Sequence, residues 1–217
     1  MRSLFPDQLR SILCLGAHCD DIEIGCGGTL LHLCQQRPDL KVTWVVFSSD
    51  AVRAAEARRS AAMFLDGSRG AEVVIKEFRN SFFPYDGAKI KEYFETLKKT
   101  VTPDLIFTHC RNDLHQDHRT VSDLTLNTFR DHFILEYEIP KYDGDLGQPN
   151  FFVSLTDDVR RRKIDAILAC FASQRDKRWF TPELFSALMR IRGMECNAPS
   201  DYAEAFYCRK AVLGGSK

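Results

Sequence analysis

Most of the histidines in this sequence lie in two short segments that also carry acidic side chains. Residues 18–23 (HCDDIE) hold one histidine and three carboxylic acids, and residues 109–118 (HCRNDLHQDH) hold three histidines and two aspartates. Only two of the six histidines fall elsewhere. Imidazole and carboxylate groups bind zinc and related divalent ions, and imidazole also transfers protons near neutral pH. The two segments therefore indicate a metal site with acid and base groups beside it.

Each segment taken alone has a simpler explanation. Asp20 or Asp21 could cap the start of a helix, because aspartate is a favoured N-cap residue. A lone histidine is more often a surface or capping residue than a metal ligand. The choice between these interpretations depends on whether the fold brings the two segments together.

Alternating strands and helices are predicted to position the two segments. Apolar runs rich in β-branched and aromatic residues predict strands at residues 11–16, 41–48, 71–75, 104–109, 133–138, 151–155 and 203–212. Helical spacing and capping residues predict helices at residues 27–36, 52–65, 86–99, 117–130, 156–171 and 181–192. This alternation predicts an α/β fold with a doubly wound, mainly parallel, Rossmann-like sheet, helices on both faces, and a single domain over residues 1–217.

The expected strand order places the two segments side by side. In the common order 3-2-1-4-5, the first and fourth strands are neighbours at the point where ligands bind in such sheets. One segment follows strand 11–16 and the other begins at the end of strand 104–109. Two His/Asp clusters at neighbouring strand ends favour a metal site over two separate caps. A catalytic zinc has three protein ligands, so the remaining acids and histidines are left for proton transfer and oxyanion stabilisation.

Length and composition exclude several classes of protein. With 44% hydrophobic and 28% charged residues, the chain is typical of a globular protein and not of a disordered or collagen-like one. Its 30 basic and 30 acidic residues balance, so no net charge favours a nucleic acid or an anionic membrane. No apolar run approaches the roughly 20 residues of a membrane span, and the first ten residues are too polar for a signal peptide. The eight cysteines form no CxxC pair, which favours free thiols in a reducing cytoplasm.

Both segments closely resemble the signature motifs of a known enzyme family. Residues 18–30 (HCDDIEIGCGGTL) and 109–118 are similar to motifs of the LmbE-like or PIG-L family of zinc-dependent N-deacetylases, which deacetylate N-acetylglucosamine-type sugars. Cys19 departs from the family pattern, which usually has proline at this position. Weaker similarity extends over most of the chain and includes Arg53, Glu56, Ser173, Gln174 and residues 202–206 (YAEAF).

The resemblance implies a zinc site and a mechanism. The zinc ligands would be His18, Asp21 and His118, and Asp20 would be the general base that takes a proton from zinc-bound water. From an extended loop, the adjacent carboxylates of Asp20 and Asp21 would point in different directions, so one could bind metal while the other faces the water. The implied reaction is hydrolysis of the acetamide of an N-acetylated amino sugar, free or in a conjugate.

The resemblance also implies roles for four residues around the zinc. His115, in its protonated form, would stabilise the tetrahedral intermediate or protonate the leaving amine, and Asp117 would orient and charge it. Arg53 and Tyr202 would contact the substrate, a small N-acetylated sugar or sugar conjugate.

Two other functions and the oligomeric state are left open by the sequence. The protein could hydrolyse another amide or an ester with a metal ion, or bind zinc without turnover. A scaffold would not need Asp20 or the pair of His115 and Asp117, and a two-metal phosphoesterase would need more ligands. The identity of the sugar and the formation of a homo-oligomer stay open.

Several other features are interpreted as structural. Residues 25–28 (GCGG) lie too far from the first strand for a dinucleotide loop and are interpreted as a site of close backbone packing at the N-terminus of a helix. The basic run at residues 160–163 is interpreted as a solvated face. Cys19 and Cys110 are interpreted as buried thiols and not as ligands. Residues 82–85 (FFPY) could form a sugar-stacking lip or ordinary packing.

Overall fold

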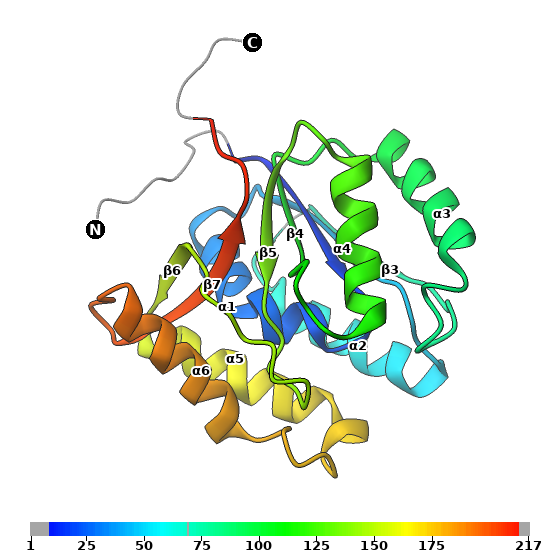
Figure 1. Cartoon of the computed structure of the whole chain (residues 1–217). Helices are drawn as coiled ribbons and strands as arrows, with labels where there is room; N and C mark the ends of the chain where they lie inside the picture. The colour runs from blue at the N-terminus through cyan, green and yellow to red at the C-terminus, as the bar shows by residue number, and fades with distance from the viewer. Residues whose placement is uncertain (1–8, 69, 213–217) are drawn as a thin grey trace.

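The computed structural model describes residues 9–68 and 70–212, and seven strands within them form one sheet. The strands are β1 (Ser11–Gly16), β2 (Lys41–Val46), β3 (Gly70–Ile75), β4 (Leu105–His109), β5 (Phe133–Tyr137), β6 (Phe151–Leu155) and β7 (Tyr202–Cys208). Their order is β3-β2-β1-β4-β5-β7-β6 (Figure 1). Strands β1 to β5 pair in parallel, and β7 is antiparallel to both β5 and β6. The predicted doubly wound, mainly parallel sheet is confirmed, with β1 beside β4.

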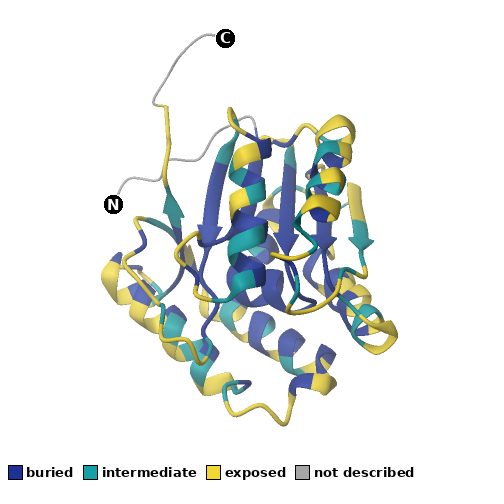
Figure 2. Ribbon diagram, turned by 45° about the vertical axis from the view of Figure 1, so that its right-hand side comes forward, coloured by how far each residue is buried: buried dark blue, intermediate teal, exposed yellow. Residues whose placement is uncertain are grey.

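Helices cover both faces of the sheet. They are α1 (Asp21–Gln36), α2 (Ala51–Phe64), α3 (Gly87–Thr100), α4 (Gln116–Thr128), α5 (Asp157–Cys170) and α6 (Pro182–Glu195), with a 3-10 turn, η1 (Ala172–Gln174). The core on one face includes α3 and α4, and the core on the other includes α1, α2, α5 and α6. Side chains of β1 alternate between them: Ile12 and Cys14 face one core, and Leu13 and Leu15 face the other. Because both faces are covered, the central strands β1 and β4 are buried except at Ser11, and Figure 2 shows the buried interior of the sheet in dark blue.

Helix α1 begins six residues before its predicted start at residue 27. It begins at Asp21 and includes Gly25, Gly27 and Gly28. Glycine lowers helix propensity by about 1 kcal/mol relative to alanine, which is why the sequence pattern missed this first half. Close packing overrides the propensity, since a Cβ added at Gly25 would lie 2.2 Å from Cδ2 of the Tyr137 ring. The acidic pair before these glycines therefore stands at a helix start, and the prediction of an extended loop there is wrong.

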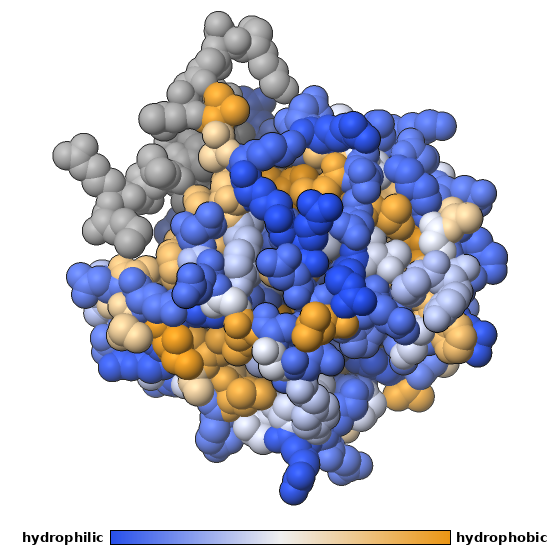
Figure 3. Space-filling model, viewed as in Figure 1, coloured by the Kyte–Doolittle hydropathy of each residue, from blue (hydrophilic) through white to orange (hydrophobic). Residues whose placement is uncertain are grey.

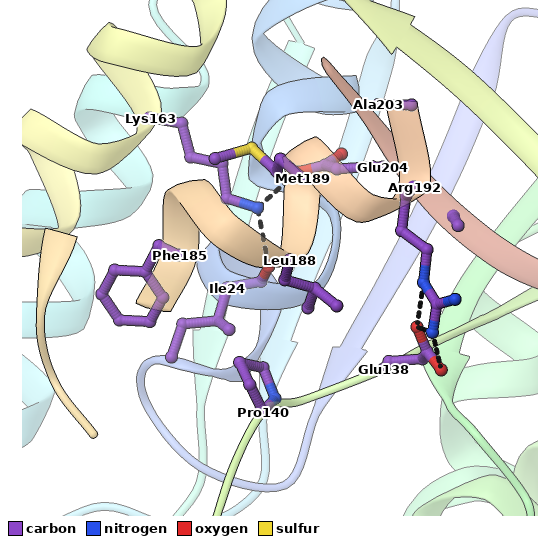
Figure 4. Close-up of a pocket in the computed structure, with 12 residues that line it drawn as sticks. Ile24, Glu138, Pro140, Lys163, Phe185, Leu188, Met189, Arg192, Ala203 and Glu204 are labelled. Atoms are coloured by element: carbon purple, nitrogen blue, oxygen red, sulfur yellow. Dashed lines mark hydrogen bonds and ion pairs between the residues drawn. The ribbon is translucent and has the colours of Figure 1, made fainter. Parts of the chain in front are cut away.

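A buried ion pair fastens α1 to α5 and β7 (Figure 4). Lys163 Nζ lies 2.6 Å from Glu204 Oε1 and donates to the carbonyl of Ile24 at 2.7 Å. The Glu204 carboxylate also accepts two backbone N–H groups of α1. The solvated face expected for residues 160–163 is therefore wrong for Lys163, because this lysine pairs with a buried carboxylate that would otherwise be uncompensated.

The cysteines of this chain are not paired in disulfides. All eight are free, as the sequence predicts.

Among the helices of residues 9–68 and 70–212, none is both long enough and apolar enough to cross a bilayer. Apolar side chains gather over α6 on the face shown in Figure 3. Ile191 and Met194 of this helix are exposed.

Replacing Gly25 by alanine tests the close packing of α1. The added Cβ would overlap the Tyr137 ring, whose hydroxyl is fixed by a hydrogen bond of 2.7 Å to the Leu15 carbonyl. We expect Gly25→Ala to lower the free energy of unfolding by about 1–3 kcal/mol, the usual effect of overpacking. Gly87→Ala in α3 is the matched control, because a Cβ there would meet nothing within 4 Å. Denaturant unfolding measures both variants, and equal stabilities would contradict this account of the packing.

Candidate metal centre

The two His/Asp segments meet at the carboxyl ends of β1 and β4. His18 lies in the turn between β1 and α1, and Asp21 is the first residue of α1. On the neighbouring strand, His109 ends β4 and His118 lies in the first turn of α4. The parallel pairing of β1 with β4 brings the two turns together. The expectation that both segments share one location is met, and the separate-cap interpretation does not account for their contacts.

Three of the predicted ligands converge on one point. His18 Nδ1 lies 3.1 Å from His118 Nε2 and 3.4 Å from Asp21 Oδ2, and His118 Nε2 lies 3.5 Å from Asp21 Oδ1. Tetrahedral ligands at bond lengths of about 2.0–2.1 Å lie about 3.3–3.4 Å apart. All three residues are buried. The donor types and their spacing therefore fit a first-row divalent metal ion.

Two aspartates orient the imidazoles of this group. Asp113 Oδ2 lies 2.8 Å from His118 Nδ1, which turns Nε2 of that ring toward the centre. Asp117 Oδ2 lies 3.3 Å from His18 Nε2, which turns Nδ1 of His18 toward the centre. Histidines that bind metal usually pair their second nitrogen with a carboxylate, a carbonyl or a water in this way.

The carboxylate of Asp117 makes no hydrogen bond with His115 among the contacts of the described residues, and it acts on that ring only through its charge, which favours the protonated form. It accepts the N–H groups of Ser81 at 2.6 Å and of Phe83 at 3.2 Å, and it faces His18. His115 Nδ1 instead accepts the backbone N–H of Asp117 at 3.2 Å. The reason is geometric, because side chains two positions apart at a helix start do not face each other.

His115 lies beside the convergent group. Its ring centroid is 4.5 Å from that of His118 and 5.0 Å from that of His18. Because Nδ1 accepts a backbone N–H, Nε2 carries the proton of the neutral ring. Burial and the charge of His18 lower the pKa of His115, which favours this neutral donor over the protonated form that the resemblance implied.

His109 is a further histidine within reach of the centre. Its Nε2 lies 3.1 Å from Asp21 Oδ2. Two groups of three residues have donor atoms within 4.8 Å of one another: one is Asp21, His109 and His118, and the other is His18, His115 and His118. However, His109 Nε2 already accepts the backbone N–H of Ala17 at 2.9 Å. His18 has no such competing donor on Nδ1 in the contacts of the described residues, and it is therefore the better third ligand.

Asp20 and Arg53 form an ion pair next to the ligands. Arg53 Nη2 lies 2.6 Å from Asp20 Oδ1, and both side chains are largely buried. Arg53 reaches this position from the first turn of α2. Asp50 caps this helix, because its side chain accepts the backbone N–H of Arg53 at 2.9 Å. Glu56, one turn further on, is buried and accepts the backbone N–H of Ser173 at 2.9 Å. The structure thus brings Arg53 to the centre and gives Glu56 a structural role.

Acidic side chains dominate the charge of the centre. Four of them are buried, and they are Asp20, Asp21, Asp113 and Asp117. Besides histidines, their cationic side-chain partners among the described residues are Arg53 and Lys141. Burial lowers the pKa of His18, but the charge of Asp21 and the contact with Asp117 outweigh it and raise this pKa to about 9. The same negative potential attracts a divalent cation.

A family comparison places this centre in a known context. The model of the PIG-L family, described as GlcNAc-PI de-N-acetylase, matches residues 13–129, which is more than half of the chain. The chain belongs to the PIG-L family. The matched region contains both motifs that carried the resemblance, and this resemblance is confirmed.

Solved structures share the fold of this PIG-L chain. N,N'-diacetylchitobiose deacetylase from Pyrococcus horikoshii is 22% identical, with a TM-score of 0.72 over 92% of this chain and 83% of that one. The conserved protein TT1542 from Thermus thermophilus is 20% identical, with a TM-score of 0.71 over 96% and 98%. GalB, a 4-carboxy-2-hydroxymuconate hydratase from Pseudomonas putida, is 16% identical, with a TM-score of 0.76 over 96% and 100%. At these identities the likeness establishes the fold alone.

Tyr202 is not brought to the metal centre by any contact of the described residues. Its ring packs beside two guanidinium groups, 4.7 Å from that of Arg160 and 5.7 Å from that of Arg190. It is the first residue of β7, where α6 covers the strand. The contact between Tyr202 and substrate stays a prediction, and these neighbours give it no support.

The thiols near the centre are buried, as the sequence predicted. Cys19 Sγ donates to the Ser48 carbonyl at 3.4 Å, and burial raises the pKa of this thiol to about 12. Burial likewise raises the pKa of Cys110 to about 11. Because a metal ligand must be a thiolate, these environments disfavour both cysteines as ligands.

The aromatic segment at residues 82–85 divides between core and surface. Phe83 is fully buried, with its ring centroid 6.2 Å from that of His18. Tyr85 is 79% exposed, and the Arg79 guanidinium lies over the Phe82 ring. Packing therefore explains Phe83, and the lip interpretation applies only to Phe82 and Tyr85.

Sequence reasoning gave no role to Asp113 or Lys141, although both belong to the centre. Asp113 lies inside the second motif, so its acidic type close to His118 was an available signal. Lys141 lies in the segment after β5 and belongs to no motif, yet its Nζ is 3.0 Å from Asp113 Oδ1. Only the folded chain reveals that contact.

The variant Asp113→Asn tests the orientation of His118. The amide keeps the size of the side chain but removes the charge opposite His118 Nδ1. We expect the affinity for Zn²⁺ to fall about 10–100-fold, the usual effect of losing a group that orients a ligand. Competition with a chromogenic chelator measures this affinity. Asp123→Asn is the control, because Asp123 is exposed on α4 and pairs with Arg111; equal affinities of the two variants would contradict the role of Asp113.

Proposed function

We propose that this protein is a zinc-dependent N-deacetylase that hydrolyses the acetamide of an N-acetylglucosamine-type sugar, free or in a conjugate. The observation that carries the proposal is the convergence of His18 Nδ1, His118 Nε2 and the Asp21 carboxylate within 3.5 Å of one another. Asp20 and His115 stand beside these atoms as additional acid and base groups. Membership of the PIG-L family supports the deacetylase assignment.

The donor set favours zinc as the metal. Two imidazoles and one carboxylate form a frequent ligand set of catalytic zinc, which keeps a further position open. A zinc ion at this position would supply Lewis-acid chemistry that polarises an amide carbonyl and makes water acidic near neutral pH. The side chains around it would supply the base, the proton donor and the contacts with substrate.

Asp20 is assigned the role of general base. Its Oδ1 is held by Arg53, which fixes the carboxylate, and its second oxygen can accept the proton that water loses as it attacks the acetamide carbon. Arg53 retains a buried Nε–H without a hydrogen-bond partner among the described residues. This donor supports the proposed contact of Arg53 with an oxygen of the substrate.

His115 is assigned the role of hydrogen-bond donor to the oxyanion. Its Nε2–H can stabilise the oxyanion of the tetrahedral intermediate. An amide nitrogen leaves only when it is protonated, and the proton that Asp20 takes from water can pass to the sugar nitrogen, which completes cleavage to acetate and a free amine. Asp117 contributes through its backbone N–H, which fixes the tautomer of His115.

The sugar part of the proposal rests on the family and on a relative of the same fold. The family description names a de-N-acetylase of a GlcNAc compound, and the Pyrococcus horikoshii relative is named as a deacetylase of N,N'-diacetylchitobiose.

Location in a reducing cytoplasm is proposed from the eight free thiols. The single domain over residues 1–217 stays a prediction.

A panel of substrates tests the proposed function. The zinc-loaded protein is incubated with N-acetylglucosamine, its oligosaccharides and its phosphate conjugates, together with simple N-acetyl amides and acetate esters. We expect acetate and an equal amount of free amine from at least one amino sugar, with loss of activity after chelation and recovery with zinc. Turnover of esters or non-sugar amides alone would favour the broader hydrolase, and no turnover of any compound would favour a zinc-binding protein without activity.

The adjacent aspartates are expected to fail in different ways when each is changed to its amide. Asp20→Asn cannot accept a proton, so it should retain zinc and lose activity by about 10²–10⁴-fold, the range typical of general-base catalysis. Asp21→Asn weakens an anionic ligand, so it should lose zinc first, and excess zinc should restore part of its activity. Zinc content and acetate release are measured on both, with Asp86→Asn at the start of α3 as the control. The reverse pattern would exchange the two roles.

Arg53→Met is expected to retain zinc and to impair turnover. Loss of a hydrogen bond to a charged group amounts to about 1.5–3 kcal/mol, so kcat/KM should fall about 10–100-fold. Arg58→Met is the control, since Arg58 lies exposed on the same helix. Unchanged kinetics of Arg53→Met on the true substrate would refute its role.

A further inference from the structure

The segment between β5 and β6 is closed at its base by a buried ion pair (Figure 4). Arg192 of α6 donates to both carboxylate oxygens of Glu138, at 2.8 and 3.0 Å. Glu138 Oε1 also accepts the N–H of Gly147 at 3.0 Å, and Arg192 donates to the carbonyl of Gly147 at 3.1 Å. Residues 138 and 147 are therefore held together, and the chain between them forms a loop with a fixed base.

The inner side of this loop is fastened to the second motif. Lys141 Nζ lies 3.0 Å from Asp113 Oδ1 and also pairs with Asp145 within the loop. Asp145 Oδ2 in turn accepts the N–H of Leu114 at 2.7 Å. The side chain of Lys141 is 10% exposed, and that of Asp113 is 2% exposed. A largely buried lysine side chain thus stands directly behind the aspartate that orients His118.

The two oxygens of Asp113 have separate partners. Oδ1 receives Lys141 Nζ and the N–H of His115, at 3.0 and 2.8 Å, while Oδ2 faces His118 Nδ1 at 2.8 Å. The His115 N–H holds Oδ1 by a hydrogen bond and the Lys141 ammonium holds it by an ion pair, and together they aim Oδ2 at the imidazole. Without Lys141, the ion pair is lost and the charge of a buried carboxylate is less well compensated.

We propose that Lys141 is a positioning residue of the metal centre, acting through Asp113 on His118. The inference rests on the metal site proposed above. It gives a role to a part of the chain that lies beyond residues 13–129, the region matched by the family model. The loop is held at its base by Arg192 of α6, so the C-terminal third of the chain supports a ligand in the second motif.

Zinc affinity of full-length variants tests this role without an assay of turnover. Lys141→Met keeps the apolar stem but removes the charge and the donors. We expect the affinity of this variant for Zn²⁺ to fall about 10–100-fold, the usual effect of losing a group that supports a metal ligand without binding the metal itself. Lys141→Arg keeps the charge and a donor, and it should recover most of the affinity. The visible spectrum of bound Co²⁺ should shift in Lys141→Met and not in Lys89→Met. Lys89 is the matched control because it pairs with Asp86 on the surface.

A double-mutant cycle separates the proposed path from a general loss of stability. In the Asp113→Asn background, Lys141→Met should cause no further loss of zinc affinity, because its route to His118 is already broken. An equal loss in both backgrounds, or wild-type affinity in Lys141→Met, would overturn the inference. If circular dichroism shows that Lys141→Met does not fold, Lys141→Gln takes its place with the same expected pattern. Absence of zinc binding by the wild-type protein would instead contradict the metal site itself.

Discussion

The burial of four carboxylates at one point is the constraint on which the rest of this structure depends. An uncompensated buried charge costs several kcal/mol, so each aspartate needs its own partners. Asp20 has Arg53, Asp113 has Lys141 and His118, and Asp117 has two backbone N–H groups. Asp21 stands at the first position of α1, where the helix dipole favours an anion, and it faces three histidines. These contacts do not compensate all of the negative charge, and a divalent cation at this position would compensate the rest.

The fold supplies the place for this cluster but does not by itself decide the reaction. A doubly wound sheet brings the carboxyl ends of β1 and β4 together, and GalB, a hydratase, shares the same architecture. The assignment of a deacetylase therefore depends on the side chains at those strand ends. A ligand group with a base and a hydrogen-bond donor beside it matches amide hydrolysis, in which the base can move a proton from water to the amine and the donor can stabilise the oxyanion.

Much of this arrangement could be predicted from the sequence because the signals are local. Alternating strands and helices gave the strand order, and the two motifs identified His18, Asp21 and His118 as a converging group. The start of α1 was missed because its glycines are placed by close packing against the sheet and against Phe64 of α2, and not by helix propensity. The orientation of Asp117 depends on which way a side chain leaves a helix start. Lys141 and Lys163 find their partners across long stretches of chain, and a pattern of residue types does not reveal such contacts.

The central claim is that His18, Asp21 and His118 hold one divalent ion, and anomalous diffraction tests it most directly. Crystals grown with zinc would be measured on both sides of the zinc absorption edge. The account predicts a single strong anomalous peak per chain, bounded by His18 Nδ1, His118 Nε2 and the Asp21 carboxylate. A peak bounded by His109 or His115 in place of His18, or no peak at this position, would contradict it.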